Sequence, residues 1–124
     1  MEHDVRKAIA FAGELIEEQK HILSPNDRTD LKFSLATSHA LEGSLDNLDT
    51  AVDMFKDSLS ESEEFNKGFI YNNLGMAHFH RFVMLSKEIG DPTKAGLDAV
   101  KPVIENFEES LHQLRLSVNQ FEMF

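Results

Sequence analysis

The chain has 124 residues, with 22 acidic side chains against 12 basic ones and a formal net charge of −10. This length suits a single domain with one hydrophobic core. Cysteine is absent, which excludes disulfides, thiolate nucleophiles and cysteine-ligated zinc. The excess negative charge repels phosphate backbones and anionic lipid at long range, so we expect no nucleic-acid partner and no membrane-surface partner. The simplest explanation of the acidic composition is that it keeps the protein soluble. The alternative explanation is that the protein binds a basic partner.

No apolar run reaches the roughly 18 residues that a membrane span needs, so direct membrane insertion is not expected. The first residues also lack the basic and apolar regions of a secretion signal. These features favour a soluble intracellular protein, in the cytoplasm or, if a targeting segment has been removed, in an organelle matrix.

Helical periodicity dominates the chain, and no segment alternates strictly as a strand would. A first apolar stripe predicts a helix from residue 2 to about residue 23. Pro25 breaks that pattern, and the next helix is expected from about residue 27 to residue 41, before Gly43. A third helix should begin near Leu45 and end in the polar stretch before residue 65.

A fourth helix is predicted over residues 65–89 and is apolar on more than one face, so it should contact neighbours on two sides and lie centrally. Gly90-Asp91-Pro92 ends it. The fifth helix starts there or after Gly96 and continues nearly to the C-terminus. Its apolar residues keep a heptad spacing and are expected to form core; they are Val100, Val103, Ile104, Phe107, Leu111, Leu114, Val118 and Phe121.

The sequence contains an internal repeat. Residues 34–41 align with residues 73–80, so that Leu35 matches Leu74 and His39 matches His78. Residues 55–59 also align with residues 107–111, each reading Phe-x-x-Ser-Leu. The repeated unit is therefore a helix pair, which buries its apolar faces by stacking on its neighbours.

At these residues the chain resembles the tetratricopeptide repeat family. Residues 73–78 are similar to the Leu-Gly core of that family's first helix, and residues 51–59 and 103–111 are similar to its second helix. The resemblance implies an all-α, right-handed stack of antiparallel helical hairpins, a solenoid of five helices and about two and a half repeats. Its units would be an incomplete one over residues 1–24, a helix pair over 27–62 and an elongated pair over 65–122.

The chain also departs from the family pattern. Ala36 stands in place of the glycine in the first pair, and Ser58 and Ser110 replace a small alanine. Leu74 lies farther from Phe107 than the matching residues of the first pair lie from each other, which predicts elongated helices in preference to a long loop. An ordinary five-helix bundle is the alternative fold.

The resemblance places a partner-binding surface on the first helix of each pair. In the second pair this surface would consist of Phe69, Asn72, Asn73, Met76, Phe79 and His80. Asn73 matches a position where family members use asparagine to hydrogen-bond a peptide backbone. Phe69 occupies a place where the family's carboxylate-binding version carries a basic residue, so recognition of an acidic C-terminus is not expected. Simple solvent exposure is the alternative for both asparagines.

A carboxylate-bridged dimetal enzyme is the remote alternative, because Glu18 with His21 and Glu109 with His112 share the Glu-x-x-His spacing. The helix phase places Glu109 and His112 opposite the apolar stripe, facing solvent, where they could not share a buried metal. We therefore predict no metal, no cofactor and no catalytic residue. His78 and its counterpart His39 are predicted to pack in the core.

The sequence thus predicts a non-catalytic protein–protein interaction module or scaffold that binds a protein segment through a helical-repeat groove. The alternative is a structural accessory subunit of a larger complex. The apolar C-terminal residues Phe121, Met123 and Phe124 favour docking of the chain into such an assembly.

Overall fold

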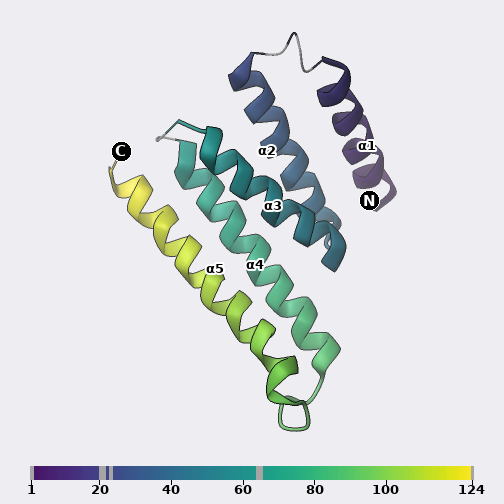
Figure 1. Ribbon diagram of the computed structural model, residues 1–124, viewed down its shortest axis with the longest axis vertical. Helices are drawn as coiled ribbons and strands as arrows, with labels where there is room; N and C mark the ends of the chain where they lie inside the picture. The colour runs from purple at the N-terminus through teal and green to yellow at the C-terminus, as the bar shows by residue number, and fades with distance from the viewer. Residues whose placement is uncertain (1, 20–21, 23, 64–65, 124) are drawn as a thin grey trace.

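The computed structural model describes residues 2–19, 22, 24–63 and 66–123, and within these residues the chain is all-helical, with no strand. The five helices are α1 (Glu2–Gln19), α2 (Pro25–Glu42), α3 (Leu45–Glu61), α4 (Lys67–Ile89) and α5 (Leu97–Met123). Each packs mainly against the helices before and after it in the chain, and α2 also touches α4. The helices form a row with α1 at one end and α5 at the other (Figure 1). The all-α, five-helix prediction is confirmed.

Local capping interactions set the limits of α2 and α3. Ser24 Oγ accepts a hydrogen bond from the Asp27 amide at 3.1 Å, and Pro25 occupies the first turn of α2, where its missing N–H costs nothing. The helix therefore starts two residues earlier than predicted. Gly43 ends it in the left-handed region at φ 84°, and Ser44 caps α3 by accepting from the Asn47 amide at 3.3 Å.

The Glu42 carboxylate holds the turn between α2 and α3 together. Its Oε2 accepts hydrogen bonds from the Ser44 amide at 3.2 Å and the Ser44 hydroxyl at 2.6 Å, and also from Asn47 Nδ2. Its Oε1 lies 3.5 Å from Arg6 of α1, and only 3% of the Glu42 side chain is exposed. The Ser44 hydrogen bonds lower the pKa of Glu42, because they favour the charged form. One carboxylate thus connects three consecutive helices.

The second helix pair is long, as predicted. Helix α4 has 23 residues and α5 has 27, and a short turn over residues 90–96 joins them. Gly90 ends α4 at φ 71°, and the Asp91 carboxylate accepts hydrogen bonds from the amide and hydroxyl of Thr93 at 3.0 and 2.7 Å. The start of α5 after Gly96 is one of the two predicted sites, and Pro102 lies inside the helix.

The hydrophobic core lies between α2, α3 and α4. In this core the aromatic ring of Phe33 on α2 packs edge to face against the ring of Phe55 on α3, with the ring centroids 5.7 Å apart. Helix α4 contacts both α3 and α5, which confirms the predicted neighbours on two sides, but the middle helix of the row is α3, so the predicted central position of α4 is wrong (Figure 1). The buried apolar residues are Leu35, Ala36, Leu48, Ala51, Val52, Phe55, Ile70, Leu74 and Ala77.

Helix α5 packs on α4 through a polar seam, which overturns the sequence prediction for this helix. The buried residues of α5 are Asn106, Ser110, Gln113 and Ser117. Ser110 Oγ donates to the Gly75 carbonyl and Ser117 Oγ donates to the Gly68 carbonyl, each at 2.8 Å. These serines bring the two backbones close together, and the glycines present no side chain that would prevent it.

The heptad stripe of α5 consequently does not form core. Ile104, Phe107, Leu111, Val118 and Phe121 are between 39% and 56% exposed, so the expectation of burial is wrong for these five residues. The physical reason is the close approach of α4 at Gly68 and Gly75, where Ser110 and Ser117 lie between the helices and hydrogen-bond to the glycine carbonyls. The apolar stripe is displaced to the side of the polar α4–α5 contact.

No helix within the described residues is long and apolar enough to cross a membrane.

Candidate functional site

All six residues predicted to bind a partner lie on α4, and most of them are accessible. Phe69 is 57% exposed, and Met76 and Phe79 are each 40% exposed. Asn72 and His80 are exposed, while Asn73 is half-buried. The long α4 therefore presents a mixed surface of aromatic, amide and imidazole groups along its accessible side.

Asn73 is turned toward α2. Its Nδ2 donates to Thr37 Oγ1 at 3.5 Å, and its Oδ1 accepts from Asn72 Nδ2 at 3.4 Å. Both distances are at the long limit for hydrogen bonds, so these contacts are weak. The Asn73 side-chain amide thus lies between α2 and α4, and among the described residues it is held only by these two weak hydrogen bonds. Another hydrogen-bonding group could replace either of them.

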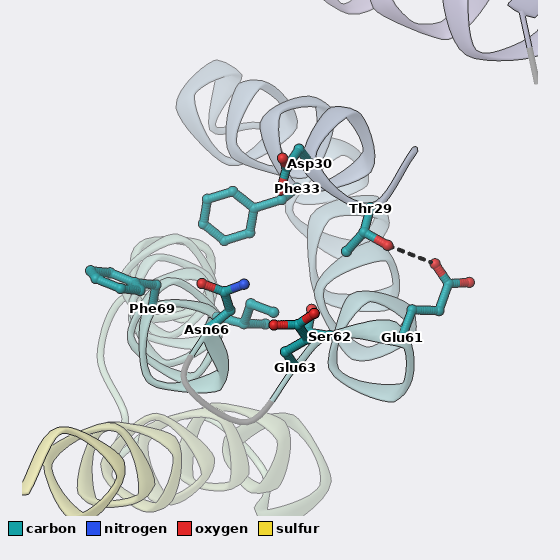
Figure 2. Close-up of a pocket in the computed structure, with 9 residues that line it drawn as sticks. Thr29, Asp30, Phe33, Glu61, Ser62, Glu63, Asn66 and Phe69 are labelled. Carbon is teal, nitrogen blue, oxygen red and sulfur yellow. Dashed lines mark hydrogen bonds between the residues drawn. The ribbon is translucent and has the colours of Figure 1, made fainter. Parts of the chain in front are cut away.

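A pocket of about 310 Å³ lies where the start of α4 meets α2 and the end of α3 (Figure 2). Phe69 is the one predicted site residue in its wall. The other lining residues come from segments distant in sequence, and sequence analysis missed them because only the packing of three helices brings them together. They are Thr29, Asp30, Phe33, Glu61, Ser62, Glu63, Asn66 and Ile70.

The pocket has an apolar part and an acidic part. The rings of Phe33 and Phe69 lie on one side, while Thr29 and Glu61 lie on the other (Figure 2). Asp30 and Glu63 add two further carboxylates to the lining. This combination suits a ligand group that carries both an apolar stem and a positive charge.

Glu61 is the only pocket carboxylate with an ion pair among the described residues. It lies 3.2 Å from Lys32 Nζ and accepts from Thr29 Oγ1 at 3.5 Å. Both partners belong to α2, so Glu61 is positioned by the α2–α3 pairing. Among the described residues that line the pocket, three carry a carboxylate and none is basic, so the lining has an excess of negative charge.

His78 is buried between α4 and α5, as predicted. It is 5% exposed, and its Nδ1 lies 3.0 Å from Asn106 Oδ1, an acceptor, so Nδ1 carries the proton and donates. Its Nε2 is buried and has no hydrogen-bond partner among the described residues. Burial lowers the pKa of His78, and the contact with Asn106 opposes that effect. His39, its counterpart in the repeat, is only half-buried and bonds to Asn47, so its predicted core position is only partly realised.

The Glu-x-x-His pairs do not assemble into a metal site in the part of the chain that is described. Glu18 is exposed, and His21 falls outside the described residues. His112 faces solvent as predicted, but Glu109 is half-buried and accepts from Gln113 Nε2 at 2.8 Å, so its predicted solvent-facing position is wrong. Within the described residues, no three histidine or carboxylate side chains are grouped to hold a metal ion.

Comparisons with family models, with curated proteins and with solved structures found no match to this chain. The fold and the pocket therefore describe a small all-helical protein that has an acidic, partly apolar pocket at one corner of its core.

Proposed function

We propose that the chain is a non-catalytic interaction module that binds a segment of another protein along α2 and α4. The pocket beside Phe69 carries the proposal, because it joins an apolar wall to an excess of carboxylates. We infer that the bound segment places a lysine or arginine side chain there. The stem of such a side chain would lie against Phe33 and Phe69, and its charged end would reach Asp30 or Glu63.

The rest of the segment would follow the accessible side of α4. Asn73 would hydrogen-bond its backbone by replacing the long contact to Thr37. Met76 and Phe79, each 40% exposed, would receive apolar side chains, and His80 would lie at the far end. Extended segments are recognised in this way when a protein offers backbone hydrogen bonds and pockets for individual side chains.

We further propose that the five helices form a right-handed, tetratricopeptide-like stack. Positions that match in the repeat support this arrangement, since Ala36 and Gly75 are both buried, as are Ser58 and Ser110. Small residues at such positions allow neighbouring helices to approach closely. A structural accessory subunit remains the second candidate function, and the exposed apolar stripe of α5 favours it.

A selection from a displayed library of random peptides tests the proposed function. Enriched peptides should carry a lysine or arginine next to an apolar residue. Salt should weaken their binding, because it screens the attraction between the positive side chain and the carboxylates of the pocket. Joint substitution Phe69→Ala and Asn73→Ala should abolish binding while helical content and melting stay unchanged. Phe11→Ala is the matched control, because Phe11 is 68% exposed on the distant α1. Equal binding to both variants would refute the site.

A further inference from the structure

The apolar stripe of α5, whose members are exposed except for the half-buried Val100 and Leu114, has the spacing of a coiled-coil seam. Its residues recur at alternating steps of three and four, from one end of the helix to the other: Leu97, Val100, Ile104, Phe107, Leu111, Leu114, Val118 and Phe121. This period brings every member to one face, which in coiled coils meets a second helix. Within the described residues, α5 packs closely only on α4; the buried polar face of α5 lies in that contact, and the apolar stripe adjoins it.

Contacts to α4 make this stripe part of a wider apolar surface. Phe121 packs edge to face on Phe69 with centroids 5.0 Å apart, and Phe107 packs on Phe82 at 5.1 Å. Leu114 lies directly over Gly75. The α4–α5 pair that carries this surface stands at the end of the row of helices (Figure 1).

The internal repeat shows that this face is unusual in being uncovered. Phe55 of α3 and Phe107 of α5 occupy matching positions in the two helix pairs. Phe55 is fully buried in the core cluster with Ile70 and Leu74 of α4, whereas Phe107 is 42% exposed. Among the described helices, none covers α5 as α4 covers α3.

The charges beside the stripe identify what could cover it. One row of exposed residues borders the seam at heptad steps and alternates in sign: Lys101, Glu108, Arg115 and Glu122. In an antiparallel pair of helices, the residues of such a row face the same row of the other helix. An alternating row can complement itself, so a second copy of the same helix is a suitable partner.

We propose that two copies of this chain associate through α5, antiparallel and related by a two-fold axis between residues 112 and 113. In this register Lys101 faces Glu122 of the second copy, and Glu108 faces Arg115. The seam residues also meet in matched layers, with Leu111 against Leu114, Phe107 against Val118 and Ile104 against Phe121 of the second copy. Each apolar group of the three overlapping heptads finds an apolar partner.

The same charges disfavour the neighbouring registers. A shift of one heptad in one direction places Glu108 against Glu108 and Lys101 against Arg115. A shift in the other direction places Arg115 against Arg115 and Glu108 against Glu122. Each alternative therefore opposes like charges across the interface, which selects the register centred between residues 112 and 113. The row on the other side of the apolar stripe consists of Val103, Ser110 and Ser117. This row has no charge, so a parallel pair of α5 helices would gain no ion pair.

Molar mass measured by light scattering on a sizing column tests the association. The native protein should have twice the 14.1 kDa mass of the chain, with a monomer appearing on dilution. Leu111→Lys should give a monomer, because it places a charge beside the axis. Leu41→Lys is the matched control on α2, where Leu41 is 71% exposed, and it should stay dimeric. A strictly monomeric native protein at millimolar concentration would overturn the proposal.

Charge reversal tests the register. Arg115→Glu alone and Glu108→Arg alone should each raise the dimer dissociation constant by about tenfold, because each turns two attractive pairs into repulsive ones. The double variant E108R/R115E should return to near the native value, since it exchanges the two signs across the axis. Failure of the double variant to recover would refute this register. Circular dichroism and thermal melting confirm that every variant is folded.

Disulfide cross-linking tests the direction of the helices, because the native chain has no cysteine. Ile104→Cys and Phe121→Cys chains should cross-link to each other when mixed and oxidised. Neither should cross-link to itself, since in the antiparallel pair two copies of residue 104 lie about 25 Å apart along the axis. Efficient self-cross-linking of each variant would instead indicate a parallel dimer and overturn the proposal.

Discussion

Ser110 of α5 donates its hydroxyl hydrogen to the backbone carbonyl of Gly75 on α4 at 2.8 Å, and this contact helps fix how the last two helices meet. Ser117 repeats it at Gly68, seven residues farther along α5 and seven residues back along α4. Two such contacts, two turns apart, set both the spacing and the rotation of α5. The orientation of its apolar stripe follows from them.

Ser110→Ala should lower the free energy of unfolding by about 0.5–1.5 kcal/mol, the usual net contribution of a buried hydrogen bond. Urea unfolding monitored by circular dichroism measures the change. Ser38→Ala is the control, because its hydroxyl bonds only to the Ser34 carbonyl of its own helix at an accessible position. Equal effects of the two substitutions would show that the Ser110–Gly75 contact contributes nothing particular.

Gly75→Ala should destabilise the protein by about 1–3 kcal/mol, the typical cost of overpacking. A methyl group there would lie 2.8 Å from Leu114 Cγ and 3.2 Å from the Leu114 backbone nitrogen, so α5 would have to shift. Thermal unfolding provides the measurement.

Gly13→Ala is the matched control for that substitution. Gly13 lies inside α1, and among the described residues no atom outside its own stretch of helix backbone lies within 4 Å of the added methyl group. Alanine should there stabilise the helix by about 0.5–1 kcal/mol, because it loses less backbone entropy than glycine. A Gly75→Ala protein that melts above the native one would disprove the close packing of α4 on α5.

Glu42→Gln should destabilise the protein most at neutral pH. Hydrogen bonds from Ser44 lower the pKa of Glu42 in the folded state, so its contribution to stability is complete above the unfolded-state pKa and is lost as pH falls through the folded-state value. The difference in unfolding free energy between native and variant proteins should therefore shrink in acid. Glu88→Gln, at an exposed site on α4, should show no comparable trend. A difference that grows on acidification would contradict the assignment.

Acidification should also destabilise the fold through His78, at a higher pH. Because burial lowers the pKa of His78, the unfolded chain takes up a proton near pH 6.5, about the ordinary histidine value, before the folded chain does. Stability is therefore lost as pH falls through that range. His78→Gln keeps a donor for Asn106 but does not titrate, so its unfolding free energy should fall less between about pH 7 and pH 5.5. Identical slopes for both proteins would rule out this contribution.

Local signals in the sequence determined the helices. Gly43 and Ser44 act on backbone groups within a few residues, so the end of α2 could be predicted without knowing the fold, whereas the predicted start of α2 near residue 27 missed the cap that Ser24 provides. The same holds for the turn after Gly90, and the spacing from Leu74 to Phe107 correctly indicated elongated helices. The all-α class and the buried position of His78 also followed from the sequence.

Only the tertiary structure decided which face of α5 packs and where the pocket lies. The heptad stripe is the strongest periodic signal in α5, yet periodicity cannot report how closely a neighbouring helix approaches. Gly68 and Gly75 allow α4 so near that serines fill the interface and the apolar residues turn outward. The pocket depends on contacts between α2, α3 and α4, and Asp30, Glu63 and Phe69 come together only because those helices pack at one corner.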